Sequence, residues 1–116
     1  LSETVKVRSV LGRYLEHSRI YSFHNGGKQA VYIGSSDLMH RNLDRRVEVL
    51  VRLEAEEHLD RINRLFELHM ADNASSWILT SEGHWDRQSS HGEPLMDVQN
   101  TMMKEAEVRN KNGASR

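Results

Sequence analysis

The tripeptide Asn25-Gly26-Gly27 constrains this sequence more than any other feature, because it lies between two segments that favour extended backbone. Asn-Gly and Gly-Gly readily adopt the positive φ angles that tight hairpin turns require. Residues 19–23 and 30–33 on either side are rich in aromatic and β-branched side chains, which are common in strands. We therefore predict an antiparallel hairpin with strands over 19–23 and 30–33.

Two short motifs flank the predicted hairpin. His17-Ser18-Arg19 opens the first strand, and Gly34-Ser35-Ser36-Asp37 follows the second. Alternation along the strand would turn His17 and Arg19 to the same face. An imidazole can attack phosphorus or donate a proton near neutral pH, and a guanidinium matches the geometry of phosphate oxygens. We expect a phosphate-handling site assembled from these two strand ends.

Hydrophobic spacing predicts the remaining body. Apolar residues three and four positions apart predict a short amphipathic helix over 5–16, and an acidic first turn followed by the same spacing predicts a helix over 54–71. Alternating valines over 47–53 predict a third strand with one face fully buried. Residues 34–43 read as a loop with one helical turn.

The last third of the chain is more polar than the rest. Residues 77–79 predict a short edge strand, and residues 81–85 a second small hairpin. A polar linker over 88–94 precedes a final helix whose start is marked by Pro94. Residues 110–116 have no apolar face to bury, so we expect this end to be disordered.

Composition limits the classes of function. With 116 residues the chain has material for one domain. Its net charge of -1 argues against a general nucleic-acid partner. The chain has no cysteine, which excludes disulfides and thiolate chemistry. No export signal or membrane span is visible, and a chain that starts at Leu1 reads as a piece of a longer protein.

Histidines in the polar third do not predict a metal site. The spacing of His84, Asp86 and His91 matches no established set of metal ligands. We therefore predict no metal ligands in this chain.

The spacing of the two motifs resembles the H-x-K…G-S-x-N signature of the phospholipase D superfamily. Arg19 stands in place of the lysine and Asp37 in place of the asparagine, while His24 falls where the superfamily has an aspartate. These departures weaken the interpretation as a simple phosphodiesterase.

A longer set of segments resembles the C-terminal domain of bacterial polyphosphate kinases that work through a phosphohistidine. The resemblance is dense from Val7 to about Leu53 and fades beyond Trp77. It is carried by GRYLEHSRIY from Gly12, NGG from Asn25, YIGSSDLM from Tyr32 and RNLDRRVE from Arg41. The fold class that this implies is α/β, part of a phospholipase-D-like domain with an antiparallel or mixed sheet flanked by helices.

The resemblance implies a polyphosphate kinase that reversibly transfers the terminal phosphate of ATP to inorganic polyphosphate. It implies that the phosphorylated histidine and the Mg²⁺ ligands lie in other domains of the same polypeptide, so that this fragment alone is inactive. His17 matches a histidine that contacts nucleotide phosphates and is proposed to protonate a leaving oxygen, and Arg46 matches a phosphate-contacting arginine. Arg19 and Arg41 are further phosphate candidates.

The same resemblance implies a cytoplasmic or membrane-associated homo-oligomer, with ATP or ADP and polyphosphate as ligands. Under it, residues 1–82 are part of the phospholipase-D-like domain, and residues 83–116 are a polar linker and a C-terminal helix. Two alternatives stay open: a phospholipase-D-like phosphodiesterase half-site that dimerises, and a non-catalytic module that binds polyphosphate or nucleotide. For Arg41 and Arg45, the alternatives to phosphate binding are a solvated surface charge or pairing with Asp37, Asp44 or Glu48.

Overall fold

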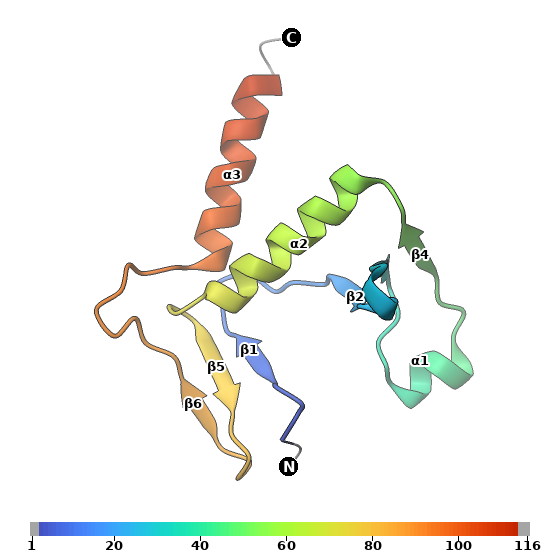
Figure 1. The fold of residues 1–116 in the computed structure, drawn as a ribbon, viewed down its shortest axis with the longest axis horizontal. Coiled ribbons are helices and arrows are strands. Elements are labelled where there is room, and N and C mark those ends of the chain that lie inside the picture. Colours follow the sequence, from blue (N-terminus) through green and yellow to red (C-terminus); the bar gives the residue numbers. More distant parts are fainter. Residues whose placement is uncertain (1–2, 114–116) are drawn as a thin grey trace. The chain divides into compact units, whose positions relative to one another are not determined.

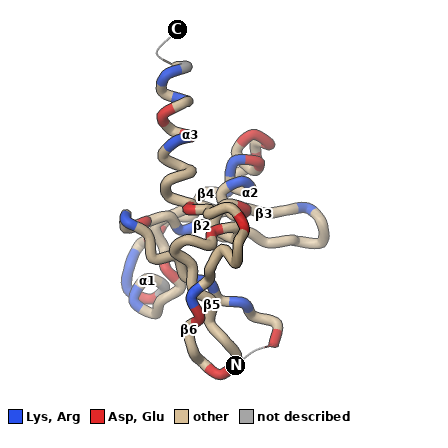
Figure 2. The backbone as a smooth tube through the Cα atoms, turned by 90° about the vertical axis from the view of Figure 1, so that its left-hand side faces the viewer, with Lys and Arg blue, Asp and Glu red and all other residues tan. Residues whose placement is uncertain are grey.

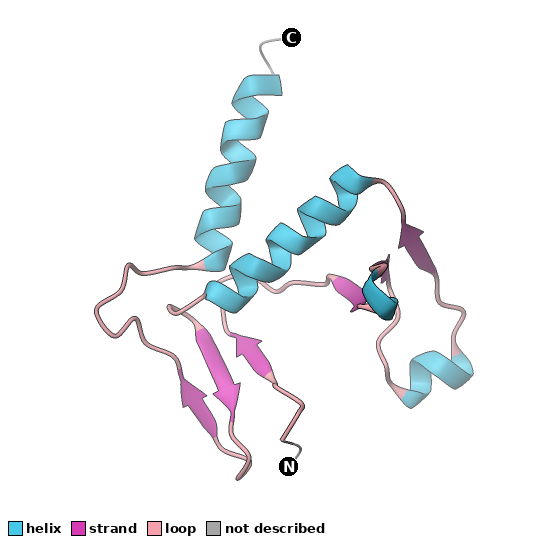
Figure 3. Cartoon of the chain, viewed as in Figure 1, coloured by secondary structure: helices cyan, strands magenta, loops and turns pink. Residues whose placement is uncertain are grey.

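A computed structural model describes residues 3–113 of the protein, apart from the side chains of Leu43 and Asn112. Its elements, drawn in Figures 1 and 3, are β1 (Arg8–Val10), β2 (Arg19–Phe23), the 3₁₀ turn η1 (Asn25–Gly27), β3 (Ala30–Gly34), α1 (His40–Arg45), β4 (Leu50–Leu53), α2 (Glu56–Ala71), β5 (Ser76–Leu79), β6 (Trp85–Arg87) and α3 (Val98–Gly113). They form two compact units. One unit is Leu15–Arg64. The other unit combines two segments of the chain, one that ends at Tyr14 and one that begins at Leu65.

The unit Leu15–Arg64 is built on the antiparallel sheet β2-β3-β4. The predicted hairpin is confirmed: β2 and β3 pair from Arg19 opposite Gly34 to Phe23 opposite Ala30. The turn between them has positive φ at all three residues, 49° at Asn25, 65° at Gly26 and 95° at Gly27, which explains why this tripeptide is needed there.

The register assigns side chains to the two faces of this sheet. Residues directly opposite each other in an antiparallel pair point to the same face. Tyr32 of β3 lies between Tyr21 of β2 and Arg52 of β4, so these three share a face with Arg19 and Phe23. Val31 points to the opposite face and is fully buried, with 0% of its surface exposed.

The hairpin is also attached to α2, the helix that the sequence predicted over 54–71. The side-chain amides of Gln29 and Asn63 exchange two hydrogen bonds, at 2.8 and 3.2 Å. Paired amides of this kind satisfy a donor and an acceptor on each side. They fix the turn end of the sheet to the middle of the helix.

The third strand is shorter and more exposed than predicted. β4 begins at Leu50 and forms an edge of the sheet. The predicted buried face is wrong, because Val49 and Val51 are 60% and 52% exposed. An edge strand has a neighbour on one side only, so alternating valines there do not guarantee burial.

The other unit contains the antiparallel sheet β1-β5-β6. The helix predicted over 5–16 is wrong: residues Arg8–Val10 form β1, which pairs with β5. The predicted edge strand over 77–79 is correct as a strand, but β5 is central, with β1 on one side and β6 on the other. The predicted small hairpin is confirmed as β5 and β6.

A single carboxylate joins the ends of three elements in this unit. Asp72, just after α2, is 1% exposed. Its Oδ1 accepts from the amides of Ala74 and Ser75 at 3.2 and 2.8 Å and from the Ser76 hydroxyl at 2.7 Å, and its Oδ2 accepts from the Val98 amide at 2.9 Å. The end of α2, the start of β5 and the start of α3 therefore share one acceptor.

The final helix starts later than predicted, at Val98 instead of next to Pro94, and continues to Gly113. The Asp97 carboxylate accepts from the Asn100 amide at 3.0 Å, which is an N-cap interaction. The expected disorder is wrong for residues 110–113, which belong to α3, and residues 114–116 lie outside the described residues. The division of the chain at residues 82 and 83 stays a prediction.

Gly12 allows the segment after β1 to pack closely against α3. A Cβ on Gly12 would overlap the side-chain amide of Gln99. That amide accepts from the Tyr14 backbone N–H at 2.9 Å and donates to the Tyr14 carbonyl at 2.8 Å. Close packing is therefore the reason for a glycine here. Across residues 3–113, no helix has the length and apolar character needed to cross a membrane.

Candidate functional site

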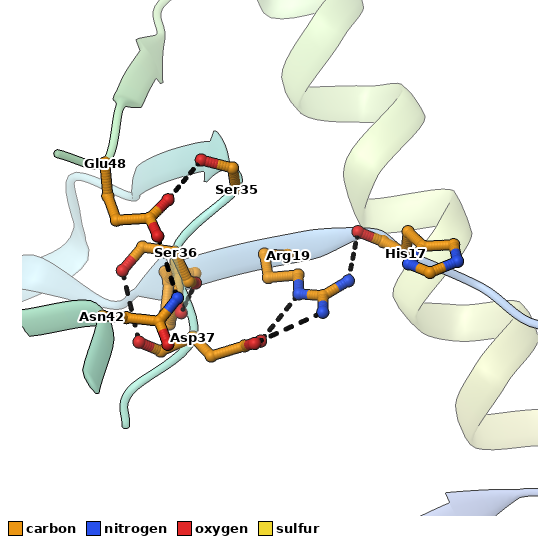
Figure 4. Close-up of polar contacts among 8 residues, drawn as sticks. His17, Arg19, Ser35, Ser36, Asp37, Asn42 and Glu48 are labelled. Carbon is orange, nitrogen blue, oxygen red and sulfur yellow. Dashed lines mark hydrogen bonds and ion pairs between the residues drawn. The ribbon is translucent and has the colours of Figure 1, made fainter. Parts of the chain in front are cut away.

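The two sequence motifs meet at one end of the β2-β3 pair. Arg19, the first residue of β2, lies directly opposite Gly34, the last residue of β3. The Arg19 Nε donates to Asp37 Oδ1 at 2.7 Å, and its Nη2 approaches Asp37 Oδ2 at 3.4 Å (Figure 4). The prediction that two strand ends bring these motifs together is therefore confirmed as geometry.

His17 lies two residues before β2, in an exposed segment without regular secondary structure. Strand alternation therefore does not extend to it, and the expectation that His17 and Arg19 share a strand face is wrong. Instead, the His17 backbone carbonyl accepts from Arg19 Nη1 at 2.6 Å. In Figure 4 the imidazole points away from the guanidinium, and His17 is exposed to solvent.

The guanidinium of Arg19 is held firmly but is not saturated. It has five N–H donors, of which two point to Asp37 and one to the His17 carbonyl. Two donors remain for another acceptor. The hydrogen bond with Asp37 raises the pKa of Arg19, and the same bond lowers the pKa of the Asp37 carboxyl. Both groups therefore stay charged at neutral pH.

Glu48 is a site residue that sequence reasoning placed only as a partner for arginines. Its Oε2 accepts from the Ser35 hydroxyl at 2.6 Å, and its Oε1 accepts from Asn42 Nδ2 at 2.9 Å. It thereby ties the end of β3 to α1. Its charge also contributes to the raised pKa of Arg19. No local pattern in the sequence predicts this bridge, because its three members come from separate segments.

The Asn42 side-chain amide donates a hydrogen bond through its nitrogen, but its oxygen has no donor among the described residues. It is 4% exposed, and its donation to Glu48 fixes the orientation of the amide. Its Oδ1 is buried and accepts no hydrogen bond from the residues that the structure describes. A buried acceptor without a donor is costly.

Gly34 and Ser35, at the end of β3, are occupied by contacts within the protein. The Ser35 amide points to the Val49 carbonyl at 3.4 Å, and its hydroxyl is bound to Glu48. A Cβ on Gly34 would overlap the Val49 carbonyl. Gly34 is therefore required for the close approach of the segment that leads into β4. The loop after β3 is held by the Tyr21 hydroxyl, which donates to the Ser36 carbonyl at 2.6 Å.

Arg41 and Arg46 lie on and just after α1, where Figure 2 shows basic positions along the helix. Both are exposed. The acids that sequence reasoning offered as their partners have other contacts: Asp37 pairs with Arg19, Asp44 with His40, and Glu48 with Ser35 and Asn42. Among residues 3–113, neither Arg41 nor Arg46 forms an ion pair with a carboxylate.

The structure does not bring all the predicted phosphate residues into contact. Arg19 touches His17 through the backbone, and Arg41 acts on the Asp37 carboxyl through its charge. Among residues 3–113 there is no cluster of three acidic or histidine side chains that would hold a metal ion.

Comparison with known sequences decides the family. The profile described as "Polyphosphate kinase C-terminal domain 2" matches residues 1–99. The chain belongs to this polyphosphate kinase domain family. It is 50% identical over 105 residues to the polyphosphate kinase of Streptomyces coelicolor, and 45% identical over 106 residues to that of Parasynechococcus marenigrum. These matches cover 89% and 90% of this chain but only 14% and 15% of those relatives.

A solved structure of the family has the same fold. The crystal structure of polyphosphate kinase from Porphyromonas gingivalis matches with a TM-score of 0.84 and 28% identity, over 95% of this chain and 17% of that one. The mixed α/β class with antiparallel sheets flanked by helices is thereby confirmed. The chain therefore spans about one seventh of the length of these two curated relatives, 14% of one and 15% of the other.

Proposed function

We propose that this domain is the C-terminal part of an enzyme that reversibly transfers the terminal phosphate of ATP to inorganic polyphosphate. In this proposal the phosphohistidine and the Mg²⁺ ligands are supplied by other domains of the same polypeptide, and the domain alone is inactive. The complete enzyme is a homo-oligomer in the cytoplasm or at the membrane, with ATP or ADP and polyphosphate as ligands.

The observation that carries the proposal is the juxtaposition of the His17-x-Arg19 and Gly34-Ser35-x-Asp37 motifs, which meet where Arg19 of β2 pairs with Gly34 of β3, in a chain of this family. Both substrates are polyanions, and fixed guanidinium groups offset charge on a transferring phosphoryl group without losing a proton. Arg19 retains two free donors, and Arg41 and Arg46 stand exposed on a neighbouring segment.

The roles differ among these side chains. The exposed imidazole of His17 contacts the nucleotide phosphates and gives a proton to the leaving oxygen. Arg46 binds a phosphate group directly. Arg19 and Arg41 add further positive charge, and Asp37 limits the freedom of Arg19 by holding its Nε edge. The Glu48 bridge positions the α1 segment that carries Arg41 and Arg46.

The test is polyphosphate synthesis from ATP by the complete polypeptide that carries this domain. His17→Ala should lower the rate at least about 100-fold, since a positioned general acid contributes about 10²–10⁴-fold. His58→Ala is the matched control, because His58 is also exposed but lies on α2. Circular dichroism should show that both variants fold. A normal rate in His17→Ala would remove His17 from the catalytic machinery.

A second variant separates binding from chemistry. Arg46→Ala should raise KM for ATP or polyphosphate more than it lowers kcat, because a lost ground-state contact weakens binding. Arg61→Ala, which removes an exposed arginine on α2, is the control. Unchanged KM and kcat in Arg46→Ala would contradict its phosphate role. Hydrolysis of a simple phosphodiester by the 116-residue chain would instead favour the phosphodiesterase half-site.

A further inference from the structure

A hollow of about 830 Å³ lies at the turn end of the β2-β3-β4 sheet. It is wide and open to solvent, and its volume falls within the range of about 300–1,000 Å³ of small-molecule sites. All of its lining residues belong to the unit Leu15–Arg64: Ser22, Phe23, His24, Asn25, Ala30, Tyr32 and Arg52. The proposed phosphate-transfer site uses none of them.

The hollow contains a pair of aromatic side chains, one of which is exposed to solvent. Phe23 and Tyr32 pack edge to face, with ring centroids 6.2 Å apart and planes at 73°. Phe23 remains 55% exposed, although burial of a phenyl ring away from water is favourable. An exposed aromatic ring beside a second one offers a stacking surface for a planar heterocycle.

The hollow also contains a cation that is weakly neutralised. Arg52 lies beside Tyr32 in the sheet register. Its Nε lies 3.7 Å from Glu54 Oε1, and the Glu54 side chain is 78% exposed. Such surface pairs contribute little, so the guanidinium can turn to an anionic ligand. His24, the residue that departs from the phospholipase D signature, lines the same hollow.

We propose that this hollow binds a purine mononucleotide, with the base on Phe23 and Tyr32 and the phosphate on Arg52. A bare polyphosphate would not use the aromatic pair, and an apolar ligand would leave the guanidinium without a partner. The combination of a planar aromatic surface and a cation selects a ligand that has both a base and a phosphate.

The hollow is separate from the phosphate-transfer site along the strand. Phe23 is at the opposite end of β2 from Arg19, and four strand steps correspond to about 13 Å. The inference does not need the transferase activity. Nucleotide binding at the hollow and polyphosphate synthesis are read by different assays, so one can fail without the other.

The test is titration of the ¹⁵N-labelled 116-residue chain with adenosine monophosphate, followed by amide chemical shifts. The amides of Phe23, Tyr32 and Arg52 should shift together. Ribose 5-phosphate, which lacks the base, should bind about 5- to 150-fold more weakly, the factor expected for loss of one stacked base. Arg52→Ala should weaken adenosine monophosphate by about tenfold or more.

Controls make each outcome decisive. Arg61→Ala removes an exposed arginine of α2 in the same unit and should leave the affinity unchanged. Phe23→Leu should lose the preference for adenosine monophosphate over ribose 5-phosphate; if it unfolds, the ribose 5-phosphate comparison on the native chain decides. Equal affinity for the two ligands, shifts confined to residues 17–19 and 41–46, or no shift in the hollow would overturn the proposal.

Discussion

Replacement of Asp72 by alanine should strongly destabilise the unit that contains α3. The side chain is almost completely buried, and it accepts from three backbone amides and one hydroxyl. Hydrogen bonds to a charged group contribute about 1.5–3 kcal/mol each, but neighbouring contributions are not additive. We therefore expect Asp72→Ala to lower the free energy of unfolding by about 3–5 kcal/mol.

The assay is urea unfolding followed by circular dichroism, with amide hydrogen exchange at Val98 as a local readout. The Val98 amide, which donates to Asp72 Oδ2 at 2.9 Å, should lose its protection first. Asp72→Asn keeps one acceptor and should lose less. Asp60→Ala, an exposed carboxylate on α2, should change stability by less than about 0.5 kcal/mol. A loss below about 1 kcal/mol in Asp72→Ala would refute this account.

The same carboxylate predicts an acid dependence. Burial raises the pKa of Asp72, but hydrogen bonds from Val98, Ser76, Ser75 and Ala74 outweigh it and leave the pKa below its ordinary value of 3.8. The stabilisation is therefore complete above pH 3.8 and is lost as the pH falls through the lower folded value. Asp72→Asn should flatten the acid limb of the stability curve, and an unchanged limb would contradict this assignment.

Two further predictions concern the candidate site. Gly34→Ala should destabilise by about 1–3 kcal/mol, because its Cβ would overlap the Val49 carbonyl and lie 2.8 Å from Leu50 Cδ2; thermal unfolding measures this, and Gly113→Ala, in open space, is the control. Asp37→Asn should change stability by less than about 1 kcal/mol but tighten binding of tripolyphosphate, since it removes the negative charge that competes with the ligand for the Arg19 guanidinium. Calorimetric titration that finds weaker binding would count against a phosphate role for Arg19.

Local residue preferences were sufficient for the hairpin and for α2. Positive φ at Asn25, Gly26 and Gly27 is required by the turn, and these are the residue types that adopt it at low cost. The register that follows places Arg19 opposite Gly34. The meeting of the two motifs could therefore be predicted from the spacing of residues around one turn.

Features set by distant partners could not be predicted in this way. Arg8–Val10 has helical spacing around it, but its conformation is decided by pairing with β5, and tertiary pairing overrides weak local preferences. Asp72 reads as an ordinary helix terminator, although it accepts from Val98 at the start of another helix. The Glu48 bridge joins Ser35 and Asn42 from different segments, so sequence spacing gave no signal for it.

The edge position of β4 has a consequence for any work on this chain alone. The strand ends its sheet, and Val49 and Val51 next to that edge are largely exposed. Unpaired backbone groups along an apolar edge are a template for another extended chain. At high concentration the chain should therefore aggregate through β4, and Arg52, as a charged residue within that strand, opposes this association.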